Sequence, residues 1–162
     1  MPSQKLYSKF RELLSSYASE SQVASLYADL VDLYSQSHRY YHTLDHINAC
    51  LKWYDEIKNE LDNVLSVALA IWFHDAIYET SGKHNEQLSA EYAVRVLSQL
   101  EIPEYVVNQV YELICLTRHP SKPSSRDSAF LIDIDLSILA VKPFKFREYE
   151  QHIRQEYQHV PA

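Results

Sequence analysis

Glycine is almost absent from this sequence, which has one glycine, Gly82, among 162 residues. This scarcity excludes the phosphate-binding loops GxGxxG and GxxxxGK[ST], which need several glycines so that the backbone can approach a phosphate closely. It also disfavours an all-β fold, because the tight turns between strands commonly need glycine. The chain is therefore expected to be mainly helical.

Cysteine is scarce as well. Cys50 and Cys115 each lie in an apolar segment with helical spacing, and neither has a second cysteine nearby. This placement favours two small core residues over a disulfide or a zinc knuckle.

Long apolar runs and clusters of positive charge are also missing. The longest apolar stretch, residues 67–73, is too short to span a bilayer, and the N-terminal segment MPSQKLYSKFRELLSSY lacks the apolar core of a secretory signal. The formal net charge is −7, and the basic residues are spread along the chain, which argues against a nucleic-acid surface. We therefore expect a cytoplasmic protein that binds neither membrane nor nucleic acid.

Apolar residues make up 46% of the chain and aromatic residues 12%, which is enough for one globular domain over residues 1–162. Most of these apolar residues recur at helical spacing, and Thr43 and Pro103 stand where helices can begin. The fold class expected is all-α, a single-domain helical bundle. The predicted helices cover residues 3–18, 21–36, 44–59, 62–78, 85–100, 103–117, 129–140 and 143–159.

The segment LIDIDLSIL, residues 131–139, has apolar residues at every second position, which is the pattern of a strand. A single strand would have nothing to pair with in a helical chain, so we interpret the segment as a buried helix. Positions 133 and 135 of a helix point about 200° apart. Only one of Asp133 and Asp135 can therefore face a given centre.

Four polar clusters interrupt the apolar helices: YHTLDHI, FHD, KHNEQLSA and DID. A divalent metal ion held by imidazoles and carboxylates would neutralise Asp75 and give the histidines a lone-pair partner. A zinc protease is poorly supported, because Thr43 occupies the place where the zincin helix needs its glutamate. The first two clusters contribute the candidate residues His42, Asp45, His46, His74 and Asp75.

The order His46, then His74 with Asp75, then Asp135 resembles the H…HD…D signature of the HD-domain superfamily of metal-dependent phosphohydrolases. The segments RYYHTLDHI, LAIWFHDAIY, NEQLSAEYA, LICLTRH, DIDLSILA and YEQHIRQEY resemble one branch of that superfamily, the predicted metal-dependent hydrolases, over residues 27–158. The resemblance implies an all-α fold and a divalent ion bound by His46, His74, Asp75 and Asp135. It does not distinguish Mn, Mg, Zn, Fe, Co and Ni.

The resemblance also implies an activity, the hydrolysis of a phosphomonoester or phosphodiester in a small nucleotide or phosphorylated metabolite by a metal-activated water. Asp75 is the residue expected to orient that water. Glu86 is the candidate for proton transfer, although a glutamate in the first turn of a helix can equally serve the helix dipole.

Phosphate oxygens are commonly bound by positively charged hydrogen-bond donors. The candidates for this role are Arg39, Lys83 and Arg118, which lie close in sequence to the site motifs. Each of them alone can also be a solvated surface charge. His42 is expected to precede the helix capped by Thr43 and to bond a ligand or the substrate rather than the ion.

Two alternatives remain open. His84 and His119 raise the question of a second metal, since binuclear HD phosphodiesterases add histidines in this interval, and a di-iron oxygenase would need firm ligation by both. The other alternative is a non-catalytic module that binds a metal or a nucleotide and assembles as a homo-oligomer through tyrosine-rich helices. Members of the branch usually continue past IRQEY with another arginine-containing helix, whereas this sequence ends at Ala162. This departure predicts a pocket wall that is incomplete or completed by a partner subunit.

Overall fold

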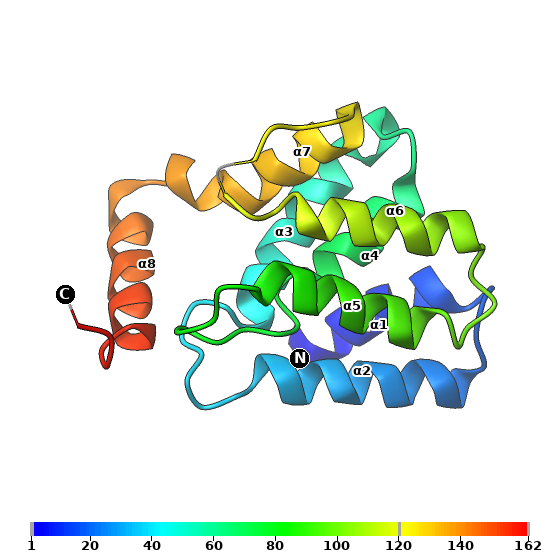
Figure 1. Ribbon diagram of the computed structural model, residues 1–162, viewed down its shortest axis with the longest axis horizontal. Coiled ribbons are helices and arrows are strands. Elements are labelled where there is room, and N and C mark those ends of the chain that lie inside the picture. The colour runs from blue at the N-terminus through cyan, green and yellow to red at the C-terminus, as the bar shows by residue number, and fades with distance from the viewer. Residues whose placement is uncertain (1, 120, 162) are drawn as a thin grey trace.

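The computed structural model describes residues 2–119 and 121–161, and within these ranges it consists of helices and loops without a strand (Figure 1). This confirms the all-α prediction, including the helical interpretation of the segment around Asp133 and Asp135. The α-helices are α1 (Pro2–Leu14), α2 (Glu20–Tyr34), α3 (Leu44–Ile57), α4 (Val64–Phe73), α5 (Asn85–Leu97), α6 (Glu104–Cys115), α7 (Arg126–Asp135) and α8 (Pro143–Glu156), with two 3₁₀ helices, η1 (Lys58–Glu60) and η2 (Leu136–Ala140).

Helix α4 is the centre of the fold. Its sequence, VLSVALAIWF, is apolar on every side, and every residue from Ser66 to Phe73 is buried. A helix that is hydrophobic all round must be surrounded, and α3, α5, α6 and α7 all contact it. Helix α1 joins the same core through Phe10, whose ring lies edge-on to Trp72 with 5.0 Å between the ring centroids. The C-terminal end of α4 is therefore held inside the molecule.

Side chains that bond to free backbone N–H groups mark where several helices begin. Thr43 accepts a hydrogen bond from the N–H of Asp45 and caps α3, as the sequence predicted. Ser19 and Gln22 form a reciprocal capping box at the start of α2, and a similar pair caps α7.

Several predicted helix boundaries are wrong; the first helix, for example, ends at Leu14 rather than at residue 18. The helix predicted over residues 62–78 ends at Phe73, so His74 and Asp75 follow the helix rather than interrupt it. The apolar pattern concealed this end because Ala76 and Tyr78, beyond it, are buried as well. Pro103 precedes α6 instead of being its first residue, and its carbonyl accepts the first hydrogen bonds of that helix.

Asp127, in the first turn of α7, fixes this helix against the start of α4. Its buried carboxylate accepts hydrogen bonds from the backbone N–H groups of Asp62 and Asn63, both at 2.8 Å. These residues precede α4, so α4, which leads into His74, and α7, which ends at Asp135, are tied together at their N-terminal ends.

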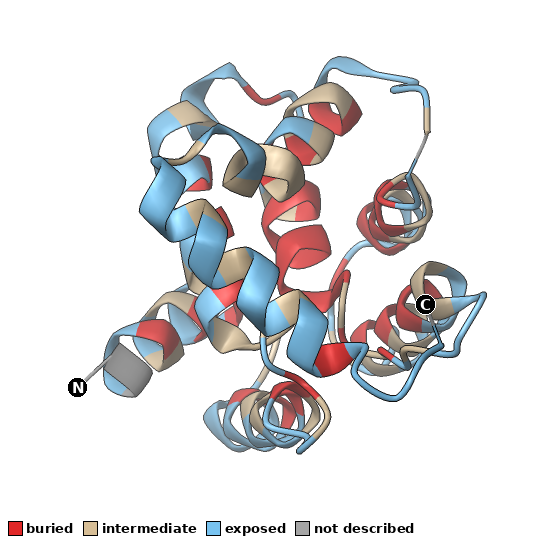
Figure 2. Ribbon diagram, turned by 90° about the vertical axis from the view of Figure 1, so that its left-hand side faces the viewer, coloured by how far each residue is buried: buried red, intermediate tan, exposed pale blue. Residues whose placement is uncertain are grey.

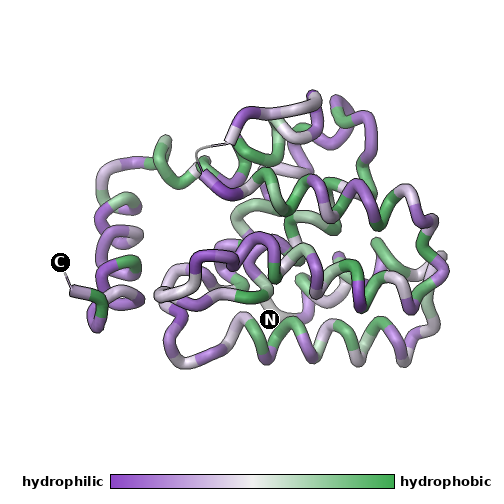
Figure 3. Tube along the Cα trace, viewed as in Figure 1, coloured by the Kyte–Doolittle hydropathy of each residue, from purple (hydrophilic) through white to green (hydrophobic). Residues whose placement is uncertain are grey.

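Helix α8 lies at one side of the molecule, next to η2 (Figure 1). In the turned view it crosses in front of the bundle and is mostly exposed, and its one buried residue is Glu156 (Figure 2). The tube coloured by hydropathy shows the same helix as predominantly hydrophilic (Figure 3).

Two further predictions concern cysteine and membranes. Cys50 is buried and Cys115 half-buried, and both are free thiols, as expected. Among the described residues, no helix combines the length and apolar character that crossing a membrane requires.

Candidate metal centre

Four side chains from three parts of the bundle converge at the end of α4. His46 lies in the first turn of α3, His74 and Asp75 directly follow α4, and Asp135 is the last residue of α7. One ligand atom from each of these residues lies within 4.8 Å of the others. The structure thus brings together the four residues that the sequence predicted as metal ligands, and both histidines are buried.

The atoms of this centre lie close to one another. The Nε2 atoms of His46 and His74 are 3.2 Å apart, and each lies 3.1 Å from Oδ1 of Asp135. Oδ2 of Asp75 is 3.1 Å from Nε2 of His74 and 3.4 Å from Nε2 of His46. Ligands about 2.0–2.2 Å from a common ion are separated from one another by about 3.0–3.5 Å. The observed separations therefore fit a single divalent ion between the four groups.

The orientation of His74 agrees with a role as a ligand. Its Nδ1 donates a hydrogen bond to the carbonyl oxygen of Ile71 at 2.7 Å. In the neutral ring this leaves the lone pair on Nε2, which points toward His46 and Asp135. Such a hydrogen bond on the far nitrogen is the usual way in which proteins orient a metal-binding histidine.

The charges of the centre are strongly coupled. Burial lowers the pKa of His74, but the carboxylates of Asp75 and Asp135 outweigh this and hold its pKa well above the ordinary value. Burial raises the pKa of both aspartates, but His74 in turn lowers the pKa of each below its usual range. A divalent ion would compete with the proton for Nε2 of His74, so metal binding at this centre should weaken in acid.

Asp135 and Asp133 are separated as helix geometry predicts. Asp135 faces the centre, whereas Asp133 is exposed. The second oxygen of Asp135, Oδ2, lies 3.0 Å from Nε2 of His119. Asp135 therefore links the four-residue centre to one further histidine.

The other candidate residues between Asp75 and Asp135 in the chain differ in their relation to the centre. The hydrogen bond to Asp135 and the nearby charge of Glu86 help to raise the pKa of His119, which places Glu86 within electrostatic range. His84, in contrast, is exposed and does not cap α5 with its side chain. Lys83 and Arg118 are exposed next to His84 and His119 in the chain.

His42 contacts Glu156, a residue for which the sequence predicted no role. Its Nδ1 donates to Oε2 of Glu156 at 2.7 Å, and its ring stacks on Tyr78 with centroids 4.1 Å apart. Oε1 of Glu156 accepts the backbone N–H groups of Tyr40, Tyr41 and His42 at 2.7–2.8 Å. In the sequence nothing distinguishes Glu156 from Glu148 and Glu150, the exposed glutamates of the same helix, because its partner lies 114 residues away. Glu156 was therefore not predicted.

The pKa values of this pair reflect the contact. Burial raises the pKa of Glu156, but its hydrogen bond with His42 and the backbone N–H groups outweigh this and bring it down to about 2. Burial lowers the pKa of His42, but Glu156 and the charge of Asp75 raise it above its ordinary value.

Arg39 forms hydrogen bonds with backbone carbonyl groups around the site. Its guanidinium donates to the carbonyl oxygens of His42, Asp75 and Ala76 at 2.7–3.1 Å, and the residue is buried. The sequence predicted that the guanidinium of Arg39 binds phosphate. Its environment does not match that prediction, because both terminal nitrogens are bonded to backbone carbonyls. Arg39 instead joins the segment before α3 to the residues that follow α4.

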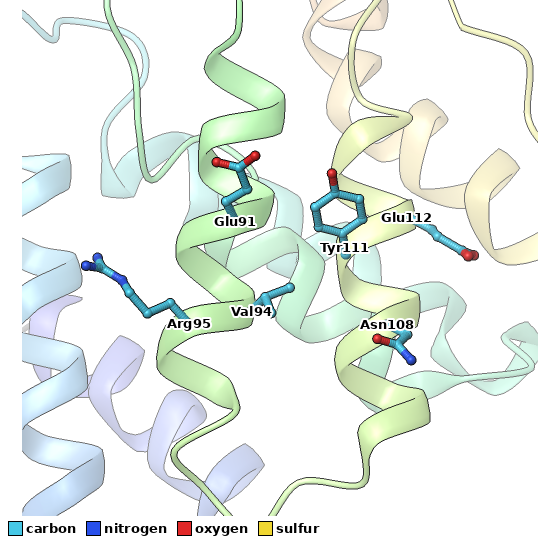
Figure 4. A pocket seen from close by; sticks show the side chains of 6 residues that line it. All are labelled: Glu91, Val94, Arg95, Asn108, Tyr111 and Glu112. Atoms are coloured by element: carbon cyan, nitrogen blue, oxygen red, sulfur yellow. The ribbon is translucent and has the colours of Figure 1, made fainter.

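A hollow of about 420 Å³ borders the centre and is bounded by α3, η2 and α8. His46, one of the four predicted ligands, is part of its wall. A second hollow, of about 510 Å³, lies between α5 and α6 and is lined by Glu91, Val94, Arg95, Asn108, Tyr111 and Glu112 (Figure 4). It contains none of the four residues of the centre, so of these two hollows only the one next to His46 borders the centre.

No protein-family model, curated protein or solved structure matches this chain.

Proposed function

We propose that the protein is a metal-dependent phosphohydrolase that acts on a small phosphomonoester or phosphodiester. The observation that carries the proposal is the convergence of His46, His74, Asp75 and Asp135 within 4.8 Å, beside a hollow large enough for a small molecule. Two imidazoles and two carboxylates suit several divalent metals, and their proximity to a hollow is typical of a catalytic rather than a purely structural site.

Bound at this centre, a divalent ion would polarise a phosphoryl oxygen and lower the pKa of a water molecule. In the reaction, the water oxygen forms a bond to phosphorus, the ester P–O bond breaks, and the departing oxygen takes up a proton. Asp75 is the residue proposed to orient the water, because its carboxylate already contacts both histidines. Glu86, which lies within electrostatic range of His119, is proposed to transfer the proton to the departing oxygen.

The binding of phosphate oxygens is assigned to Lys83 and Arg118, whose exposed side chains follow α4 and α6. His42 is proposed to contribute through Nε2, since Glu156 already engages its Nδ1. Arg39 is left out of this set, because its donors are bonded to backbone carbonyls.

A centre with two metals is a second candidate, favoured by one observation. His119 contacts Oδ2 of Asp135, while His46 and His74 contact Oδ1, so His119 with Asp135 would hold a second ion beside the one held by the four-residue centre. The di-iron oxygenase belongs to this case, but it also requires His84, which is exposed. In a His119→Ala variant, loss of about half the bound metal would support two ions, and an unchanged content would support one.

The test of the proposal is phosphate release from a panel of small phosphomonoesters and phosphodiesters, measured with metal-loaded protein. Turnover that disappears in Asp75→Asn and persists in Asp133→Asn would support the phosphohydrolase. A protein that binds metal but releases no phosphate from any ester would instead be a non-catalytic binding module.

A further inference from the structure

We propose that the hollow bounded by α3, η2 and α8 binds the leaving group of the substrate, and that it selects an uncharged, flat aromatic group over a second phosphate or a carboxylate. This inference rests on the proposed function, because it assumes that the phosphoryl group binds at the four-residue centre. It goes further by assigning the chemical class of the rest of the substrate.

The position of the hollow follows from one face of α3. His46, Ala49 and Trp53 all line it, and they are spaced by three and four residues, so they lie along one side of the helix. Seven residues of helix span about 10 Å, which is the distance along the axis from His46 to Trp53. A phosphoryl group at the centre would therefore direct its ester group along this face.

Ala49 creates the room in this arrangement. A small side chain between a histidine and a tryptophan leaves a depression above it, and the residue is exposed rather than covered by another part of the described chain. The hollow has a volume of about 420 Å³. Pockets for small molecules are commonly about 300–1,000 Å³, so a single ring system with its phosphate fits this space.

The walls of the hollow are aromatic. Trp53 is 52% exposed, which is unusual for an indole and leaves much of its surface available for contact. Tyr149 of α8 also lines the hollow and lies edge-on to Tyr41 with centroids 4.7 Å apart, and the ring centroid of Tyr41 lies 4.9 Å from that of His46. Aromatic rings thus continue from α8 to the four-residue centre, and together with Trp53 they offer apolar surface for a flat ring.

The charges at the hollow oppose an anionic leaving group. Asp45 and Glu148 line it together with a single lysine, Lys145, which gives a net charge of −1 when His152 is counted as neutral. A leaving group that carries a second phosphate or a carboxylate would meet this negative balance and be disfavoured.

The experiment uses phosphonates, which bind like phosphate esters but cannot be hydrolysed. The affinities of phenylphosphonate, methylphosphonate and 4-carboxyphenylphosphonate are measured by isothermal titration calorimetry on the metal-loaded full chain. We expect phenylphosphonate to bind at least about tenfold more tightly than methylphosphonate, because it buries a ring. The 4-carboxyphenyl compound should bind more weakly than phenylphosphonate, and Glu148→Gln should narrow that difference.

Two variants act on the hollow without touching the four residues of the centre. Ala49→Leu fills the depression, and Trp53→Ala removes the exposed indole. Each should lower the affinity for phenylphosphonate at least about fivefold and leave that for methylphosphonate unchanged. Tyr105→Ala, which removes an exposed tyrosine of α6 outside the hollow, is the matched control and should change neither.

The outcomes separate this inference from the proposed function. Equal affinity for the phenyl and methyl compounds, or an unchanged affinity in both Ala49→Leu and Trp53→Ala, would overturn the subsite even if esters are hydrolysed. Selective binding of the phenyl compound without turnover of phenyl phosphate would uphold the subsite and contradict the phosphohydrolase.

Discussion

Glu156 bonds to His42 across 114 residues of sequence, with 2.7 Å between Oε2 of the carboxylate and Nδ1 of the imidazole. The same carboxylate gathers three consecutive backbone N–H groups before α3 on its other oxygen. This contact holds the C-terminal end of α8 against the segment that leads into α3, the helix that carries His46. The one fully buried side chain of α8 thereby orders one wall of the candidate site.

Replacing Glu156 should destabilise the protein, because Glu156 is buried and its carboxylate is fully bonded. Glu156→Gln removes a charge that accepts four hydrogen bonds, and we expect the free energy of unfolding to fall by about 1–3 kcal/mol. Chemical denaturation monitored by circular dichroism measures this change. Glu150→Gln, at an exposed position of the same helix, is the control and should stay within about 0.5 kcal/mol of the wild type.

The lowered pKa of Glu156 predicts that the stability of the protein depends on pH. The pKa of Glu156 is about 2 in the folded chain, below the ordinary value of about 4.3 for an unfolded glutamate. A lowered pKa means that the stabilisation is present above about pH 4.3 and is lost as the pH falls toward 2, by an amount on the order of 3 kcal/mol. The difference in unfolding free energy between wild type and Glu156→Gln, measured from pH 6 down to pH 3, should shrink. A difference that is constant over this range would contradict the assigned contact.

Asp127 offers a test of the fold itself. Its carboxylate accepts two backbone hydrogen bonds that tie α7 to the start of α4, and Asp127→Ala should lower the free energy of unfolding by about 1–3 kcal/mol. Denaturant titration measures the loss. Asp133→Ala, at an exposed position on the same helix, should have little effect, and equal losses in the two variants would count against the connection.

Asp133 and Asp135 provide a matched pair for the metal centre. Asp135→Asn removes the negative charge that touches both His46 and His74, and we expect metal affinity to fall by about tenfold or more. Asp133→Asn changes an exposed carboxylate and should leave the affinity unchanged. Titration of metal into each variant by calorimetry distinguishes the two, and the reverse order would show that the wrong face of α7 had been assigned to the centre.

The sequence predicts the helices well because each amphipathic segment carries the spacing of its own buried face. It predicts their ends less well, since buried residues such as Ala76 and Tyr78 continue the apolar pattern after α4 has ended. The strand-like alternation around Asp135 was resolved correctly by a general argument, that a single strand has no partner. Helix geometry then separated Asp133 from Asp135.

The environment of the centre was harder to predict, because it depends on contacts between distant segments. Arg39 has the sequence appearance of a free cation, but its neighbours in space are the carbonyls of residues that follow α4. Glu156 cannot be told from Glu148 and Glu150 of the same helix until the fold places it beside His42. Sequence patterns within one segment carry no information about such pairs.

The metal content of the purified protein tests the central claim most directly. Wild type, His74→Ala and Asp133→Asn are purified without added metal or chelator and compared by elemental analysis. The four-residue centre predicts about one equivalent of a divalent metal in wild type and in Asp133→Asn, and its loss in His74→Ala, because removing one of four ligands breaks the site. An absence of metal in all three that persists after soaking with divalent ions, or equal metal in all three, would contradict the assignment.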